Sequence, residues 1–410
     1  MRVALVIFGD LDQPSGGYLY DQRLVRSLRA AGHRVTIVSQ PPDLPYRRQR
    51  RLGRRTLKAV RAGGSVSEEH RGSDDLATIA RLTEVRPDLV IIDELNHAVV
   101  GPWLSALSSV LPGVHVTGLV HHLRSDESGA PRRSRRWERQ FLRGCDSFLC
   151  NSNVTLARVQ RVSGVRRPSA VAFPGGDSAG YGRGDGTPSP RPSTPSGPPA
   201  VPAGTAGSPP TATRRKPLRL LSVGSVIPRK NFHTVVDAVA SMPEVHLSIV
   251  GDTNVDARYT ELLREKIDRH HVADRVVLRG RVPVDLLESE FENADLFALP
   301  SKYEGFGIVF LEALSRGIPV IAPAAGGARD IVRPRTDGYL VRPGSVRQVR
   351  RAISEVLHHP ETLTAMSRAA RQRSEQFHSW ERSMAGAVRF LETVAAAPVT
   401  AGGRGASRSV

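Results

Sequence analysis

The chain has 410 residues, of which 40% are hydrophobic, and a formal net charge of +18 from 58 Lys and Arg against 40 Asp and Glu. This length is too great for one typical core and predicts two domains. The sequence has no apolar run of about 18 residues and only two cysteines, which argues against a transmembrane helix, a disulfide framework and a cysteine-based metal cluster and favours the cytoplasm. The excess charge suits an anionic substrate, an anionic membrane surface or nucleic acid, unless it reflects only an arginine-rich source composition.

Residues 1–176 alternate between strand and helix patterns, which predicts a doubly wound α/β domain. The apolar run at 1–8 is short and lacks a cleavage site, so it is interpreted as the first strand of a parallel sheet rather than as a signal peptide. A later buried strand at 114–120 ends at His121 and His122. Because ligands of open α/β sheets gather at the carboxyl ends of strands, these histidines are candidate site residues.

Residues 177–217 consist largely of Gly, Pro, Ser, Thr and Ala, with few apolar side chains large enough to pack. Such a segment cannot offset its ordering entropy, so we expect a disordered linker or insertion. A second α/β domain is expected at 218–377, followed by a helix at 378–396 and a disordered tail at 397–410.

The most informative stretch runs from Leu299 to Ala313 and reads LPSKYEGFGIVFLEA. An apolar run from Leu296 to Leu299 predicts a short buried strand that stops at Pro300, and a glycine-rich loop then leads to a helix expected from Ile308 to Arg316. Glu304 lies just ahead of the helix start, and Glu312 lies about two turns into the helix. Glycines let a ligand approach the backbone, and the helix N-terminus favours anions. The unit could therefore hold a ligand that is both hydroxyl-rich and phosphorylated, such as a nucleotide sugar.

This stretch resembles the paired-glutamate motif of the retaining family 4 glycosyltransferases, which have the GT-B fold. The resemblance covers most of the chain except 40–75, the linker and the tail. It implies two Rossmann-like, doubly wound parallel-sheet domains that face a cleft, with a nucleotide-diphosphate sugar held by the second domain and an acceptor by the first. The same resemblance implies that the helix at 378–396 crosses back to the first domain. It also implies transfer of a hexose-type sugar to a hydroxyl of a small-molecule, glycan or lipid acceptor, with retention of anomeric configuration and without a cofactor.

The resemblance assigns roles around the motif. Glu312 would hydrogen-bond the ribose of the donor, and Glu304 would hold a hydroxyl of the transferred sugar. The backbone amides of Phe306 to Ile308 would meet the phosphate. Lys230 matches a lysine that grips the donor diphosphate, whereas the position of the family's arginine holds Ser225, so Arg229 is a candidate replacement.

Gly16 and Gly17 match a glycine pair that the family places in the cleft, although they could be simple turn glycines. His121 is the first choice, and His122 the second, for a histidine that faces the transferred sugar and the donor phosphate. Arg281 and Val282 are weaker candidates for reading the base. The expected catalytic residues are His121, Glu304 and Lys230, and the expected donor-binding residues are Gly16, Gly17, Arg229, Lys230, Val282, Gly305, Phe306, Gly307, Ile308 and Glu312.

No metal is expected, because the Asp10 and Asp12 pair stands without further ligands. Basic runs at 47–61 and 132–141, the second with two aromatic residues at helical spacing, could contact an anionic membrane at the inner face or be solvated surfaces. No nucleic-acid-binding module surrounds either run. Two rival functions are a non-catalytic nucleotide-sugar or polyanion-binding protein of the same fold and a nicotinamide-dependent dehydrogenase. The dehydrogenase is disfavoured because no strand is followed by Gly-x-Gly-x-x-Gly with a later acidic residue.

Overall fold

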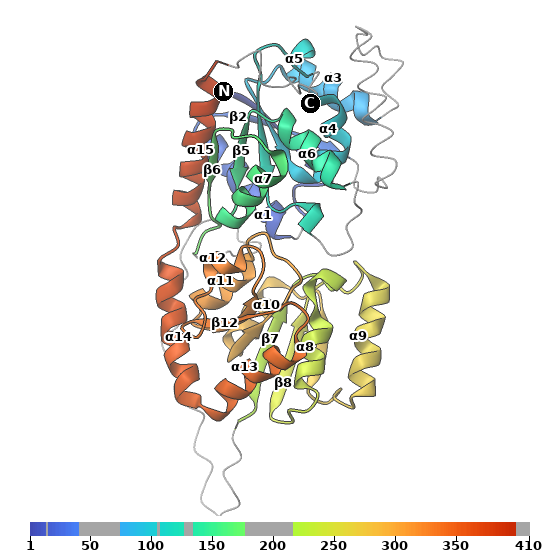
Figure 1. The fold of residues 1–410 in the computed structure, drawn as a ribbon, viewed down its shortest axis with the longest axis vertical. Coiled ribbons are helices and arrows are strands. Elements are labelled where there is room, and N and C mark those ends of the chain that lie inside the picture. Colours follow the sequence, from blue (N-terminus) through green and yellow to red (C-terminus); the bar gives the residue numbers. More distant parts are fainter. Residues whose placement is uncertain (14, 41–73, 105–106, 127–133, 177–215, 399–410) are drawn as a thin grey trace, which may run out of the picture.

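The computed structural model describes residues 1–13, 15–40, 74–104, 107–126, 134–176 and 216–398, which form two α/β domains stacked along the long axis (Figure 1). Each domain contains one six-stranded sheet, and the strand pairs of the described residues are all parallel. The expected fold of two doubly wound, Rossmann-like domains is therefore confirmed. Residues 399–410 of the expected tail and residues 177–215 of the expected linker lie outside the described residues.

Domain 1 has the strand order β2-β1-β3-β4-β5-β6. Its apolar strands β1, β3 and β4 are almost entirely buried, because helices cover both faces of a parallel sheet. The strands are β1 (Arg2–Phe8), β2 (Arg34–Gln40), β3 (Leu89–Asp93), β4 (His115–Val120), β5 (Ser147–Cys150) and β6 (Ser169–Val171). The helices are α1 (Gly16–Ala30), α3 (Asp74–Val85), η2 (Glu94–Asn96), α4 (His97–Leu104), α5 (Leu107–Val110), η3 (Arg124–Asp126), α6 (Ser134–Gly144) and α7 (Asn153–Ser163).

Domain 2 has the strand order β12-β11-β10-β7-β8-β9. Its strands are β7 (Leu218–Val223), β8 (Val245–Val250), β9 (Val276–Gly280), β10 (Leu296–Ala298), β11 (Val320–Pro323) and β12 (Gly338–Val341). Its helices are η4 (Pro228–Lys230), α8 (Phe232–Val239), α9 (Ala257–Arg269), α10 (Val284–Glu292), α11 (Ile308–Ser315), α12 (Ala328–Ile331), α13 (Val346–His358) and α14 (Pro360–Glu375).

The last helix, α15 (Trp380–Ala396), returns from domain 2 and packs beside α1 of domain 1 (Figure 1). Its first residue, Trp380, is 2% exposed and meets the Tyr20 ring edge-on at 6.0 Å between centroids. Nearer the boundary, the rings of Phe173, Phe306 and Phe377 contact one another, with centroids 5.8–6.1 Å apart. One hydrophobic cluster consequently continues from domain 2 into one face of domain 1.

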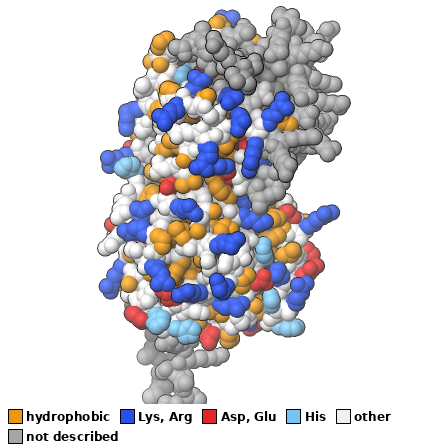
Figure 2. Space-filling view, viewed as in Figure 1, with side chains coloured by type: hydrophobic (Ala, Val, Ile, Leu, Met, Phe, Trp, Pro, Cys, Tyr) orange, Lys and Arg blue, Asp and Glu red, His pale blue; other side chains and the backbone are white. Residues whose placement is uncertain are grey.

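The carboxyl ends of the strands in both domains point toward the domain boundary. Gly16, after β1, lies against Ile308 at the start of α11, and His121, after β4, lies against Gly305, after β10. This boundary is where the doubly wound fold places a ligand. On the described face shown in Figure 2, Lys and Arg side chains are spread over both domains rather than gathered in one patch. None of the helices in the described ranges combines the length and hydropathy needed to cross a bilayer.

Candidate functional site

The loop between β10 and α11 carries the first motif glutamate, and its glycines are set by close contacts. Gly307 has φ +96°, and a Cβ atom there would lie 2.5 Å from the ring of Phe310. A Cβ atom on Gly305 would lie 2.0 Å from the carbonyl oxygen of His121 in domain 1. Gly305 thus lets the two domains touch at this loop, whereas its expected contact with the donor stays a prediction.

Two neighbouring basic residues converge on Glu304, whose side chain is buried. Lys230 Nζ lies 2.9 Å from Glu304 Oε1, and Arg229 Nη1 lies 3.4 Å from Oε2. Arg229 also donates to the carbonyl oxygen of Tyr303 at 3.0 Å. Adjacent side chains on a strand would diverge, but both residues belong to the short turn η4, which ends at Asn231 in the left-handed conformation. This turn brings both cations to one carboxylate.

The positive charges of Lys230 and Arg229 keep the Glu304 carboxyl ionised. Burial would raise the pKa of this carboxyl, but the positive charges of Lys230 and Arg229 lower it to about 2. Burial also lowers the pKa of Lys230, and the charge of Glu304 opposes that shift. At neutral pH Glu304 is therefore a carboxylate that only accepts hydrogen bonds.

Glu312 lies on α11 in the opposite electrostatic situation. Its side chain is buried, and Oε1 has no hydrogen-bond partner among the described residues. Burial raises the pKa of this carboxyl to about 7; the charge of Arg316 lowers it and that of Glu288 raises it further. A buried acceptor without a partner can receive a hydroxyl of a ligand.

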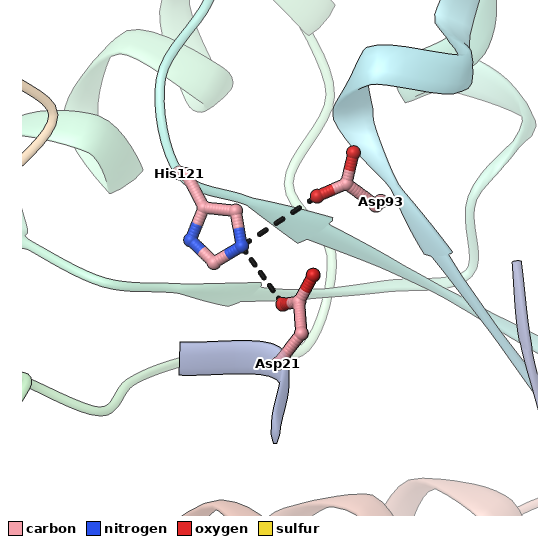
Figure 3. Close-up of side chains that lie close together, drawn as sticks. All are labelled: Asp21, Asp93 and His121. Atoms are coloured by element: carbon pink, nitrogen blue, oxygen red, sulfur yellow. Dashed lines mark hydrogen bonds and ion pairs between the residues drawn. The ribbon is translucent and has the colours of Figure 1, made fainter. Parts of the chain in front are cut away.

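His121 lies at the end of β4 between two buried carboxylates, Asp21 from α1 and Asp93 from the end of β3 (Figure 3). Its Nε2 lies 2.9 Å from Asp21 Oδ1 and 3.5 Å from Asp93 Oδ2. Burial would lower the pKa of the imidazole, but Asp21 and the nearby charges of Glu94 and Asp93 raise it to about 10. These acidic neighbours favour the imidazolium form of the ring, and its Nδ1 has no hydrogen-bond partner among the described residues.

The same three side chains form a group that could hold a metal ion, because their ligand atoms lie within 4.8 Å of one another. A metal ion would have to replace the Nε2 proton of His121, which faces the carboxyl groups of Asp21 and Asp93 in this structure. Asp10 and Asp12 are exposed and belong to a local turn, in which Asp10 Oδ1 accepts from Asp12 N at 3.1 Å. The absence of a metal requirement stays a prediction.

The other expected residues lie around this boundary. A Cβ atom on Gly17 would lie 3.4 Å from the ring of His121, so the glycine pair meets the histidine as well as α11. The side chain of His122 is 22% exposed, and its Nδ1 lies 3.6 Å from Glu94 Oε1. Val282 follows β9 and packs, half-buried, against the core. The structure therefore brings Gly16, Gly17, His121 and Ile308 together, and Glu304 together with Arg229 and Lys230.

Asp21 and Asp93 were missed in the sequence, although signals for both were present. Asp21 lies four residues after Gly17, one helical turn along the same face of α1. Asp93 ends a buried strand, where functional side chains of open α/β sheets gather. Their shared target, His121, comes from a third segment, and only the folded sheet brings the three together.

The basic run at 47–61 lies outside the described residues. The second basic segment forms α6, whose Phe141 is 1% exposed and belongs to the core of domain 1. Phe141 therefore packs inside domain 1 and does not contribute to the surface of this segment, whose contact with a membrane stays a prediction. Arg135 and Arg136 are exposed on α6, whereas Arg139 donates to a carbonyl oxygen of α7 at 3.0 Å.

Two family models match consecutive parts of the chain. The model described as Glycosyltransferase Family 4 matches residues 19–178, and the model described as Glycosyl transferases group 1 matches residues 208–373. The chain is 34% identical over 183 residues to the GDP-mannose-dependent alpha-(1-6)-phosphatidylinositol monomannoside mannosyltransferase of Mycobacterium tuberculosis, covering 42% of this chain and 46% of that protein. It is 29% identical over 165 residues to the sulfoquinovosyl transferase SQD2 of Arabidopsis thaliana, covering 40% of this chain and 31% of that protein. The matched regions thus span less than half the length of these relatives.

Solved structures share the fold over nearly the whole chain. Sucrose-phosphate synthase from Thermosynechococcus elongatus has a TM-score of 0.71 at 19% identity, covering 96% of this chain and 98% of that one. Anabaena Alr3699/HepE in complex with UDP-glucose has a TM-score of 0.68 at 16% identity, covering 95% of this chain and 99% of that one. At this identity the likeness shows the fold alone.

Proposed function

We propose that this chain, which belongs to the family 4 glycosyltransferases, transfers a sugar from a nucleotide-diphosphate sugar to a hydroxyl of an acceptor. The observation that carries the proposal is the convergence of Lys230 and Arg229 on Glu304 directly before the N-terminus of α11. Fixed positive charge beside a helix N-terminus suits a diphosphate, and a carboxylate suits sugar hydroxyls. A solved structure of the same fold is a complex with UDP-glucose, so the fold is compatible with a donor of this class.

The donor would occupy the boundary with its diphosphate at Lys230, Arg229 and the start of α11. The family's arginine position holds Ser225, and Arg229 supplies a guanidinium from the other end of the same loop. A lysine ammonium has three donor hydrogens, so Lys230 could keep its bond to Glu304 while it binds a phosphate oxygen. Glu312 would accept the ribose hydroxyls in domain 2, where its Oε1 has no hydrogen-bond partner within the described ranges.

The leaving nucleoside diphosphate gains negative charge as the glycosidic bond breaks, and fixed cations can stabilise that charge without a metal. His121 would contribute from domain 1, because its imidazolium is held by Asp21 and its Nδ1 has a hydrogen left to donate. With the donor bound between the domains, Nδ1 of His121 would donate to a sugar hydroxyl or to a phosphate oxygen. We propose retention of anomeric configuration from the resemblance to the paired-glutamate motif.

The acceptor side of the proposal is broader. One relative acts on a phosphatidylinositol monomannoside, and the exposed Arg135 and Arg136 of α6 could contact anionic headgroups at the inner face of the membrane. Each Lys or Arg near such a surface contributes about 1 kcal/mol, so two residues alone bind weakly. A lipid acceptor is therefore one option beside small molecules and glycans. Vesicles with anionic lipid should bind the protein at low salt and release it as salt rises, whereas equal binding to neutral vesicles would remove the idea.

A thermal-shift comparison of UDP, GDP and ADP tests the donor site. A nucleotide at about one hundred times its dissociation constant should stabilise the protein by about 2.7 kcal/mol. The shift should be lost in Lys230→Ala and kept in Lys266→Ala, a matched control whose ammonium pairs with Asp237 on the outside of domain 2. Shifts of equal size in both variants would contradict the site. Donor binding without release of nucleoside diphosphate, with or without acceptors, would identify a non-catalytic binder.

A further inference from the structure

The N-terminus of α7 in domain 1 receives a carboxylate from domain 2. Ser152 is the N-cap of this helix, and its Oγ accepts from Thr155 N at 3.0 Å. The first turn of α7 contains no acidic residue of its own. Asp330, on α12 of domain 2, supplies a negative charge at this helix start instead. Its Oδ2 accepts from Asn153 N at 3.0 Å and from Val154 N at 3.5 Å. Amide groups that every helix leaves free at its N-terminus are thus satisfied across the domain boundary.

The same cap residue also reaches the donor-binding loop. Ser152 Oγ donates to the carbonyl oxygen of Gly305 at 2.8 Å, and Thr155 Oγ1 lies 3.4 Å from the same oxygen. Both hydroxyl side chains are buried, so water does not compete for these bonds. The close approach depends on Gly305, because a Cβ atom there would collide with the backbone of His121.

The segment that leads to Asp330 supports the other side of this loop. Gly327 N donates to the carbonyl oxygen of Glu304 at 2.8 Å. A Cβ atom on Gly326 would lie 1.9 Å from that same oxygen, so the two backbones are in direct contact. Asp330 and the Glu304–Gly305 peptide therefore belong to one packed unit of domain 2, and α7 contacts this unit at two points.

Resting on the proposed function, we propose that Asp330 and Ser152 are positioning residues that form an interdomain latch between α7 and the Glu304–Gly305 loop. When these contacts are made, they fix the position of the Glu304 carboxylate relative to the Gly16–Gly17 segment of domain 1, on the two sides of the donor site. The donor itself is held mainly by domain 2, through Arg229, Lys230 and Glu312. The latch therefore affects turnover more than donor binding, because it orders the two sides of the site relative to each other.

Ordinary interdomain packing would predict a different result. If Asp330 merely contributed stability, its removal would lower the melting temperature and leave turnover per folded molecule unchanged. A latch predicts a lower kcat with a nearly unchanged dissociation constant for the donor nucleotide. Asp330→Asn keeps an oxygen acceptor for Asn153 N but loses the charge, so its kcat should lie between those of the wild type and Asp330→Ala.

The experiment compares the full chain with Asp330→Ala, Asp330→Asn, Ser152→Ala and the double variant Asp330→Ala with Ser152→Ala. Asp268→Ala is the control, since Asp268 is an exposed carboxylate on α9, on the outer side of domain 2. Each protein is measured by donor turnover, by nucleotide affinity and by hydrogen–deuterium exchange of the ligand-free form. We expect Asp330→Ala and Ser152→Ala each to lower kcat by about tenfold, with nucleotide affinity within about twofold, as for loss of one charge-assisted or buried hydrogen bond. The double variant should lose less than the product of the two single effects, because both residues serve one contact.

Hydrogen exchange separates failure of this proposal from failure of the proposed function. In the ligand-free protein, Asp330→Ala should speed exchange both at the start of α7 and in the 304–308 segment, whatever reaction the protein performs. Faster exchange at α7 alone, with kcat as in Asp268→Ala, would overturn the latch. If no nucleotide sugar is turned over by the wild type, the proposed function fails, and coupled exchange of the two segments still decides whether the latch exists.

Discussion

Donor binding should strengthen as the pH rises through neutrality, and Glu312 should be the cause. Its carboxyl is buried on α11, no described residue hydrogen-bonds its Oε1, and burial raises its pKa to about 7. Ribose hydroxyls donate to a carboxylate more strongly than to a protonated carboxyl, so binding favours the ionised form. About one tenth of Glu312 is ionised at about pH 6 and about nine tenths at about pH 8. If binding requires that form, the dissociation constant should fall about tenfold over this range, or about 1.4 kcal/mol.

The assay is calorimetric titration with an intact nucleotide sugar in the absence of acceptor. A nucleotide sugar is preferable to a free nucleoside diphosphate, because a terminal phosphate with a second pKa near 6 would titrate in the same window. Glu312→Gln keeps the size of the side chain and removes its titration, so its affinity should be independent of pH across the range. Histidines that lose charge on the way up would weaken binding and cannot mimic the predicted direction. A flat profile for the wild type, or an equal slope in Glu312→Gln, would refute the reasoning.

The same raised pKa has a consequence for stability. Between the ordinary pKa of glutamate, about 4.3, and the folded value of about 7, the folded state binds the Glu312 proton more tightly than the unfolded state. The contribution of this group to the free energy of unfolding should therefore be largest at low pH and decrease as the pH rises through this window. Chemical denaturation of the wild type and of Glu312→Gln at several pH values isolates this contribution from that of other groups.

The remaining predictions concern the Glu304 cluster and its loop. Lys230→Ala should lower kcat/KM by about tenfold to more than a hundredfold, since hydrogen bonds to charged groups contribute about 1.5–3 kcal/mol. Arg229→Ala should lower kcat/KM by a smaller factor, because the contact of Arg229 with Glu304 is 3.4 Å long whereas that of Lys230 is 2.9 Å. Glu304→Gln should lower kcat in steady-state assays with little change in nucleotide affinity. An equal loss of kcat and of nucleotide affinity would contradict the proposal that Glu304 contacts the transferred sugar. Gly305→Ala should lower the free energy of unfolding by about 1–3 kcal/mol and also slow turnover, because the new Cβ would push against the backbone of His121 in the other domain. A variant with the melting temperature and kinetics of the wild type would exclude that contact.

The sequence predicted the fold well because its signals are local. Apolar runs mark the strands, and the motif around Glu304 places that residue directly before a helix that begins at Ile308 in the structure. The convergence of Arg229 with Lys230 was doubtful from the sequence, since it depends on the tight turn η4. The partners of His121 were missed, because Asp21 and Asp93 meet it only through the order of the strands.

The role of Gly305 shows a second limit of the sequence. Its position in a glycine-rich loop predicted close approach of a ligand, which stays a prediction, but gave no sign that the backbone of domain 1 would lie beside it. Periodicity within one segment carries no information about which distant segment will lie against it. Likewise, Phe141 and Trp137 have helical spacing, yet only packing shows that Phe141 faces the core.

The central claim, metal-independent transfer with retention, is tested most directly by following one reaction by NMR in the presence of EDTA. The protein is incubated with the nucleotide sugar that binds best and with a set of hydroxyl acceptors, and both nucleoside diphosphate release and the anomeric configuration of the product are recorded. We predict release that depends on the wild-type Glu304 and Lys230, continues at full rate in EDTA, and gives a product with the anomeric configuration of the donor. Activity abolished by EDTA and restored by magnesium or manganese, or a product of inverted configuration, would contradict the account.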